Sequence, residues 1–333
     1  MNSIKLKVSL ISNFITIFSL ILLGVITFIF VKNIVFSSVS TAEMNYLRGA
    51  SVSLTSFRSN NIDSLDRFSK KVSQLSINRL QSDTMLDNVG PMVSVFRAAH
   101  GYLSAYIADP HTGNIVVSNS DSDKEGSDYI LYGEKQNYDA RTRVWYKGAL
   151  KTQGIYVSEP YMDQATGLPT FTYSMAIYKN GILVGVLAFD VLTSKLQTMF
   201  DELPGRIFSF DENGTVFVSS DHKLLNPNND ELQNLKMIFE GSRNHKDYEP
   251  FYYTNVAGDE RYVVCAKTGL NTSCVGESLA VINKPVVEIA WKQATIVSII
   301  IVLNVIIMYF IISRMLTPLQ FIQQGLLSFF KYI

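Results

Sequence analysis

Two long apolar runs without charged residues most constrain what this chain can fold into. One covers residues 8–31 and the other covers residues 294–313. A bilayer core of about 30 Å requires about 20 apolar helical residues, so each run is long enough to cross a membrane. The sequence therefore predicts two transmembrane helices, with a folded segment at 32–293 between them.

Each run has a second interpretation. The first could be a cleaved signal peptide, but such peptides have apolar cores of about 7–15 residues followed by a small-residue cleavage site, which favours an uncleaved anchor here. The second could be a buried core helix, although its length without charge favours a span. Lys5 and Lys7 predict that residues 1–7 are cytoplasmic. Lys32, Lys284 and Lys292 on the other side weaken this argument.

Composition excludes several functional classes. The formal net charge is zero, whereas nucleic-acid-binding proteins usually carry a basic excess, so no nucleic-acid partner is expected. The four histidines have no metal-ligand spacing, and two cysteines cannot form a four-cysteine zinc site. Nucleophile–base motifs and phosphate-binding glycine loops are not recognisable. We therefore expect no metal site, no cofactor, no catalytic residues and no enzymatic activity in this segment.

The two cysteines, Cys265 and Cys274, lie within a short strand–turn–strand pattern. A hairpin would bring their side chains together, and a disulfide there would fit an oxidising compartment outside the cytoplasm. The alternative is a pair of unpaired buried thiols.

The external segment begins with a helical pattern. Apolar residues recur at intervals of three and four from Leu47 through Leu54, Phe57 and Phe68 to Leu75, which predicts an amphipathic helix that continues from the first span. Such a stripe can pack on its own domain, on the same helix of a partner, or on both. Helical signals fade at Gly90-Pro91, and strand-like periodicity is expected from about residue 93.

One strand pattern occurs twice in the external segment. A turn at residues 109–113 precedes an apolar strand, and residues 211–214 repeat this order. Further strands follow each copy, with Asn180-Gly181 as a strong hairpin signal. These strands are expected at 170–177 and 182–191 in the first half and at 251–253, 261–266 and 275–282 in the second. The sequence thus predicts two copies of one α+β module, divided near residues 203–205.

This organisation resembles the double-Cache sensor domains of bacterial chemoreceptors and sensor kinases, whose modules are PAS-like. The resemblance implies an α+β fold: a long N-terminal helix and membrane-distal module at 33–203, and a membrane-proximal module at 204–291, both between the two spans. Residues 314–333 look like the start of a HAMP linker, so we expect a chain truncated within that linker.

A motif in the first module makes the resemblance more specific. Members that bind amino acids share a Tyr, an Arg-x-Trp-Tyr segment, a second Tyr and an Asp. This chain matches with Tyr138, Arg143, Trp145, Tyr146, Tyr161 and Asp190, and Asp163 looks like an additional contact. The resemblance implies that Arg143 and Trp145 hold the ligand carboxylate, while the tyrosines and Asp190 hold its ammonium group.

The chemistry of these side chains agrees with that assignment. An arginine can donate two hydrogen bonds to a carboxylate, and tyrosine ring faces attract a cation. The alternative is that Trp145 and Tyr146 belong to the core and that Asp190 only terminates a strand. The second module lacks the motif, so we assign it to signal transmission.

The resemblance implies a transmembrane chemoreceptor of the methyl-accepting chemotaxis type, in the bacterial inner membrane with its large domain periplasmic. It would bind an L-amino acid and form a homodimer or mixed receptor clusters. Two alternatives stay open: the input half of a sensor histidine kinase or diguanylate cyclase, or a stand-alone ligand-binding membrane protein.

Overall fold

In the computed structural model, which describes residues 2–80, 83–163 and 166–331, the chain forms two compact units. One unit contains Met1–Ala42 and Glu277–Ile333, and the other contains Glu43–Gly276. Helix α1 (Asn2–Ser73) contributes to both units, and α7 (Leu279–Lys331) contributes to the first.

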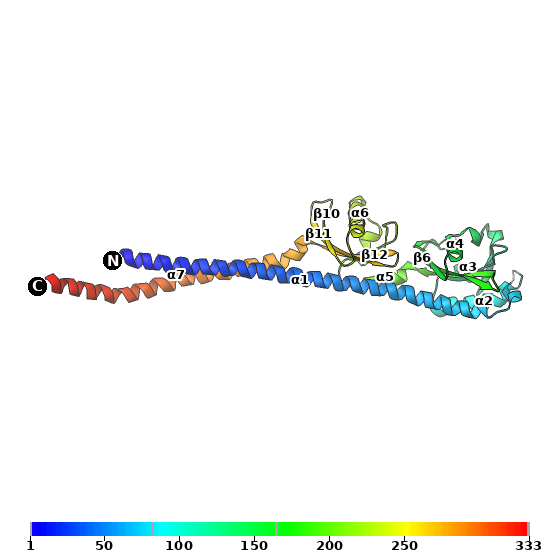
Figure 1. The fold of residues 1–333 in the computed structure, drawn as a ribbon, viewed down its shortest axis with the longest axis horizontal. Helices are drawn as coiled ribbons and strands as arrows, with labels where there is room; N and C mark the ends of the chain where they lie inside the picture. The colour runs from blue at the N-terminus through cyan, green and yellow to red at the C-terminus, as the bar shows by residue number, and fades with distance from the viewer. Residues whose placement is uncertain (1, 81–82, 164–165, 332–333) are drawn as a thin grey trace. The chain divides into compact units, whose positions relative to one another are not determined.

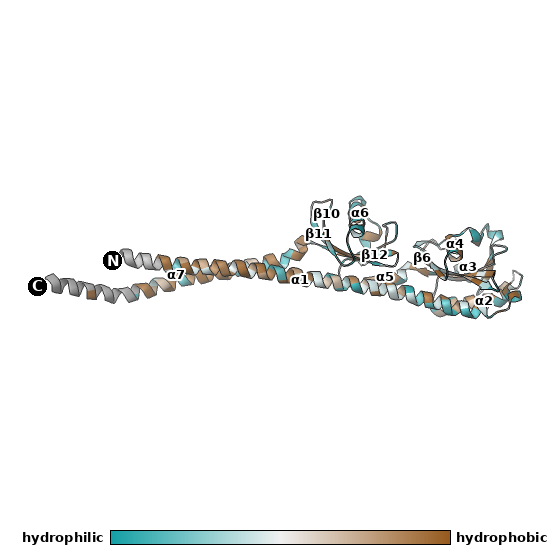
Figure 2. Ribbon diagram, viewed as in Figure 1, coloured by the Kyte–Doolittle hydropathy of each residue, from teal (hydrophilic) through white to brown (hydrophobic). Residues whose placement is uncertain are grey.

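The first unit contains two helical segments whose apolar side chains face outward. Phe14 is 72% exposed and Phe310 is 67% exposed, and Figure 2 colours long parts of both helices as hydrophobic. Hydroxyl groups within them donate to carbonyls four residues earlier, as Thr27 does to Leu23 and Ser298 does to Ala294. A helix in lipid must satisfy its polar groups internally in this way. By length and composition, Leu10–Ser73 and Leu279–Ile312 contain candidate membrane spans.

The second unit begins with the amphipathic part of α1. Leu47, Leu54, Leu65 and Phe68 are buried, at the helical spacing that the sequence shows. After α1 the chain forms a short 3₁₀ turn, η1 (Ile77–Leu80), and then α2 (Met85–His100).

Helix α2 corrects the expectation that strand structure begins near residue 93. Met85, Val89, Val93 and Phe96 are buried at intervals of four, four and three, so one face of the helix packs inward through the proline. Gly90 is required beside that proline, because a Cβ atom there would lie 2.2 Å from the Tyr129 ring. The buried face outweighs the backbone cost of Pro91.

The first sheet has the order β3-β2-β1-β7-β6-β4, and β5 pairs with β6. Its strands are antiparallel in every pairing described, and Figure 1 labels β6 within this sheet. The strands are β1 (Ser104–Ala108), β2 (Ile115–Ser118), β3 (Ile130–Tyr132), β4 (Ile155–Val157), β5 (Tyr161–Met162), β6 (Pro169–Lys179) and β7 (Ile182–Leu192). Short helices connect them: α3 (Ser120–Lys124), η2 (Glu134–Gln136), η3 (Ala140–Thr142) and α4 (Val144–Lys151).

The turn between β6 and β7 contains the predicted Asn180-Gly181 pair. Both residues have positive φ angles, 51° and 79°, which a tight hairpin turn requires and which Asn and Gly adopt most easily. The hairpin that this turn closes carries Asp190 on its second strand.

The second sheet has the order β10-β11-β12-β8-β9 and follows helix α5 (Thr193–Asp201). Its strands are β8 (Ile207–Phe210), β9 (Val216–Ser219), β10 (Pro250–Thr254), β11 (Glu260–Thr268) and β12 (Asn271–Ser278), with η4 (His222–Leu225) and α6 (Asn229–Asn244) between β9 and β10. A disulfide joins Cys265 to Cys274. The expected strand at 275–282 ends earlier, because residues from Leu279 onward begin α7.

The two sheets have the same connectivity. Read from β9, the second sheet has the order β9-β8-β12-β11-β10, which corresponds to β2-β1-β7-β6-β4 in the first. In each sheet the first two strands form a hairpin and the last long strand returns beside the first. The predicted α+β class with two modules of one topology is therefore confirmed.

Candidate ligand-binding site

A small cavity lies on one face of the first sheet. The space open to water in it is about 60 Å³. A single buried water needs roughly 10–15 Å³ by this measure, so the cavity has room for several non-hydrogen atoms of a ligand. Its lining comes from β1, β2, β3, β5, β7 and the loops around α3 and α4: Ser104, Tyr106, Ile115, Val117, Asn119, Asp121, Tyr132, Tyr138, Arg143, Trp145, Tyr161, Asp163 and Asp190.

Asp190 lines this cavity and is only 3% exposed. The strand register puts Ser104 of β1 on one side of it and Thr172 of β6 on the other. Both hydroxyls donate to its carboxylate, and the Tyr106 hydroxyl donates to Oδ1 at 3.0 Å. The carboxylate is therefore fixed by three neutral donors from the two neighbouring strands, β1 and β6.

Burial raises the pKa of Asp190 to about 6, because the charged form loses its hydration. The hydrogen bonds from Ser104 and Thr172 act in the opposite direction and keep the shift from being larger. At neutral pH this is a buried anion whose described donors are all uncharged. A cation entering the cavity would therefore gain a strong partner.

Arg143 and Trp145 lie at the start of helix α4. Arg143 is the N-cap residue in an extended conformation, and Trp145 is in the first turn and 3% exposed. The Trp145 ring meets the Tyr106 ring edge-on with centroids 5.0 Å apart. Among the described ion pairs none involves Arg143, so its guanidinium is available to a ligand anion.

Aromatic hydroxyls and a second carboxylate, that of Asp163, also belong to the polar lining. The Arg143 guanidinium lies 5.8 Å from the centre of the Tyr138 ring. Burial raises the pKa of Tyr138 to about 12 and that of Tyr161 further, so both phenols stay protonated. The Tyr161 hydroxyl lies 2.6 Å from Thr172 Oγ1. Asp163 accepts from the backbone and the hydroxyl of Thr166.

The structure places six of the seven motif residues in the cavity lining and leaves Tyr146 outside it. Tyr146 is 4% exposed and packs edge-on against Trp145, with ring centroids 5.8 Å apart. It belongs to the hydrophobic core cluster that also contains Tyr106 and Trp145. Tyr146 is therefore placed to support the Trp145 ring and not to contact a ligand.

Several lining residues were not identified from the sequence. Ser104 and Tyr106 alternate along β1, and Ile115, Val117 and Asn119 alternate along and just beyond β2. Period-two alternation is the signal that could have indicated them. The face they share becomes visible only once the strand register is known. Within the described residues, no group of three or more acidic, histidine or cysteine side chains is placed to hold a metal ion.

Comparisons with known proteins agree on one family. Residues 94–198 match the model of the methyl-accepting chemotaxis protein-like, first PDC sensor domain. A probable methyl-accepting chemotaxis protein of Bacillus thuringiensis is 22% identical over 275 residues, which cover 78% of this chain and 38% of that protein. The chain thus spans less than half the length of this curated relative.

Solved structures extend the similarity beyond the first module. The sensory domain of the Campylobacter jejuni chemoreceptor Tlp3, with isoleucine bound, is 28% identical with a TM-score of 0.65 and covers 77% of this chain and 98% of that chain. The same domain in complex with 4-methylisoleucine gives a TM-score of 0.67 and covers 75% and 95%.

Proposed function

This chain carries a Cache sensor of the methyl-accepting chemotaxis receptor family, and from that premise we propose that it binds a small L-amino acid in the cavity of its first module. The observation that carries the proposal is the presence of two opposite charges in one small cavity. Arg143 supplies a cation, and Asp190 supplies a buried anion without a charged partner among its described donors.

Each half of an amino acid has a matching group. The α-carboxylate would accept from the Arg143 guanidinium and the Trp145 indole N–H. The α-ammonium would donate to Asp190, beside the rings of Tyr138 and Tyr161. Asp163 would add a second acceptor for the ammonium, and Tyr146 would hold Trp145 in place. The Campylobacter relative with isoleucine bound supports this ligand class.

We further propose that residues 8–31 and 294–313 cross the inner membrane, with the sensor outside the cytoplasm, and that the receptor acts in chemotaxis as a homodimer or in mixed clusters. A ligand changes the balance of two receptor states only if it binds one of them more tightly. A difference of about 1.4 kcal/mol in binding free energy changes the population ratio tenfold.

The test is calorimetry on the full chain in lipid nanodiscs, titrated with a panel of L-amino acids. We expect micromolar affinity for at least one, about −8 kcal/mol. Asp190→Asn and Arg143→Gln should each weaken that binding by about 100-fold, because each leaves a ligand charge without its partner, at about 2–3 kcal/mol.

The matched control is Arg141→Gln. Arg141 lies two residues from Arg143 but pairs with Asp139 at 2.7 Å and is not part of the cavity lining. Its affinity should equal that of the wild type. Full affinity in Asp190→Asn, or no binding of any amino acid by folded wild-type receptor, would contradict the proposed function.

A further inference from the structure

The cavity has a second polar end, formed by Asn119 and Asp121. Tyr106 pairs with Val117 and Ala105 with Ser118 across β1 and β2, so Asn119 follows beside Ser104, which itself pairs with Asp190. Asn119 and Asp190 therefore lie about two strand spacings apart, roughly 10 Å. Ile115, Val117 and Tyr132 also line the cavity and supply apolar surface to it.

Helix α3 determines which atoms this end offers to a ligand. Asn119 is its N-cap, and Oδ1 accepts from the backbone N–H groups of Asp121 at 3.0 Å and Ser122 at 3.1 Å. The amide oxygen is thereby committed to the helix. The Nδ2 donor remains as the group that Asn119 can present to the cavity.

Asp121 offers an acceptor in the same part of the lining, two residues after Asn119. Its carboxylate pairs with Lys124 at 2.9 Å, but the Lys124 side chain is 71% exposed. A pair as exposed as this contributes little, about 0–1 kcal/mol, so a ligand group can compete for the carboxylate. One donor and one acceptor in the same lining match a carboxamide.

The charges of the lining residues also disfavour an acidic ligand side chain. Among the described lining residues the cation is Arg143, and the carboxylates are Asp121, Asp163 and Asp190. The head group of an amino acid balances Arg143 and Asp190, and Asp163 is assigned to the ammonium group, which leaves Asp121. A ligand side chain with its own negative charge would lie near Asp121 and be repelled.

We propose that Asn119 and Asp121 select the ligand side chain, and that the site takes amino acids whose side chain ends in N–H donors, a carboxamide or an ammonium group, and rejects acidic ones. This inference rests on the proposed function. The side-chain methylenes would lie along Val117 and Tyr132, while the terminal group meets Asn119 and Asp121.

The test compares glutamine with glutamate and lysine with norleucine, by calorimetry on the full chain in nanodiscs. Glutamine and glutamate are nearly identical in shape and differ in the terminal group, and norleucine has the side-chain carbons of lysine without its ammonium group. Glutamine or lysine should bind at least tenfold more tightly than its partner. Asp121→Asn should reduce that preference at least tenfold, and Asn119→Asp should weaken glutamine binding while preserving the helix cap, since Asp caps as well as Asn.

Asp123→Asn is the matched control, because Asp123 is on the same short helix but pairs with Arg97 and does not line the cavity. The selectivity of this variant should be that of the wild type.

The inference is wrong if glutamate binds as tightly as glutamine. It is also wrong if norleucine binds as tightly as lysine and Asp121→Asn changes neither affinity ratio. Binding of these amino acids through Asp190 without such preferences would leave the proposed function intact. Absence of binding by all four would contradict the inference, and absence across the full amino-acid panel would contradict both.

Discussion

At the scale of single residues, Asp190 explains why this site suits a cation. Its pKa of about 6 lies about two units above the ordinary value of 3.8, which corresponds to roughly 3 kcal/mol in favour of the protonated form. Because the folded-state pKa is raised, the stabilising contribution is present below pH 4 and is lost as the pH rises through 6. Ionised Asp190 therefore destabilises the folded protein without a ligand, and a bound ammonium group would offset that destabilisation.

This shift predicts how ligand binding depends on pH. An ammonium ligand requires ionised Asp190 and lowers its pKa, so affinity should be constant above about pH 7 and fall by up to tenfold per unit below pH 6. Calorimetry between pH 5 and pH 8 measures the change. Asp190→Asn should show weak binding without this slope, and a wild-type Kd that is equal at pH 5 and pH 7 would contradict the role assigned to Asp190.

The motif residues can be identified from the sequence, but the residues that hold their side chains in position cannot. Arg143, Trp145 and Asp190 stand out because large or charged side chains in a fixed order are uncommon. Ser104 and Thr172 bond directly to Asp190, yet they are 86 and 18 residues away from it in the chain. Hydroxyl residues in strands are common, and only the register of β1, β7 and β6 shows that these two flank one carboxylate.

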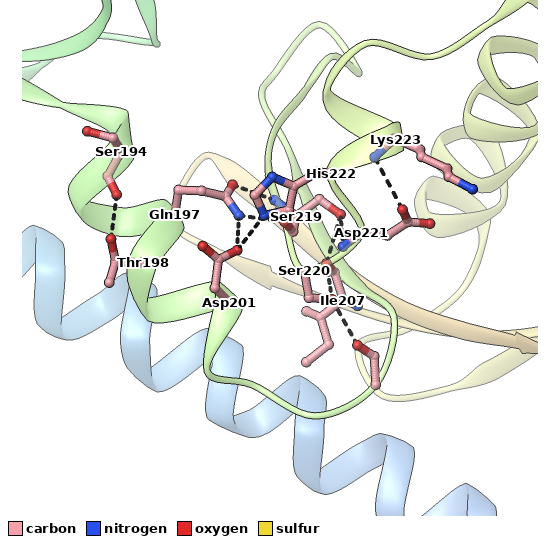
Figure 3. Close-up of polar contacts among 11 residues, drawn as sticks. Ser194, Gln197, Thr198, Asp201, Ile207, Ser219, Ser220, Asp221, His222 and Lys223 are labelled. Atoms are coloured by element: carbon pink, nitrogen blue, oxygen red, sulfur yellow. Dashed lines mark hydrogen bonds and ion pairs between the residues drawn. The ribbon is translucent and has the colours of Figure 1, made fainter.

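At the scale of elements, helix α5 connects the ligand strand to the second module. It begins at Thr193, three residues after Asp190, and its Gln197 side chain contacts β9, an edge strand of the second sheet. The Gln197 amide donates to Ser219 O at 2.6 Å and accepts from Ser219 N at 3.1 Å, and Figure 3 shows both contacts. The amide thereby satisfies backbone groups that an edge strand otherwise leaves unpaired.

Replacing Gln197 with Ala should destabilise the sensor by about 1–3 kcal/mol, because Ser219 is fully buried and both its backbone groups would lose a partner. Thermal unfolding of the full chain measures the loss. Thr198→Ala is the control: Thr198 is on the same helix, and its hydroxyl donates to Ser194 O within it (Figure 3). That variant should stay within about 0.5 kcal/mol of the wild type. Equal melting temperatures for the two variants would show that the contact between Gln197 and Ser219 does not stabilise the fold.

Secondary structure was predictable where one local signal dominated. The Asn180-Gly181 turn and the long apolar strands around it are cases of this kind. Helix α2 was missed because Gly90 and Pro91 are local signals for a break, whereas the packing of Val89, Val93 and Phe96 on the sheet decides the outcome. Burial of this sort depends on partners distant in sequence, which periodicity alone cannot identify.

At the scale of the whole molecule, the burial of α1 constrains where a partner could bind. Leu47 and Leu54 were expected as dimer contacts or as contacts with the chain's own domain, and the structure buries both within the second unit. Val52, on another face of α1, is 64% exposed. A dimer through this helix would therefore use the face that contains Val52.

A cysteine scan tests that geometry. Val52→Cys should form disulfide-linked dimers in oxidised membranes, whereas Leu47→Cys should not, because its side chain is inaccessible. Non-reducing gels of the full chain give the result. Cross-linking at position 47 but not at 52 would contradict this arrangement.

The account as a whole depends on how a ligand lies between Arg143 and Asp190. A crystal structure of the full chain with an amino acid selected by calorimetry measures this directly. We predict the ligand carboxylate within hydrogen-bonding distance of Arg143 and of the Trp145 indole N–H, and the ammonium group on Asp190. A ligand bound outside this cavity, or one that places no cationic group against Asp190, would contradict the account.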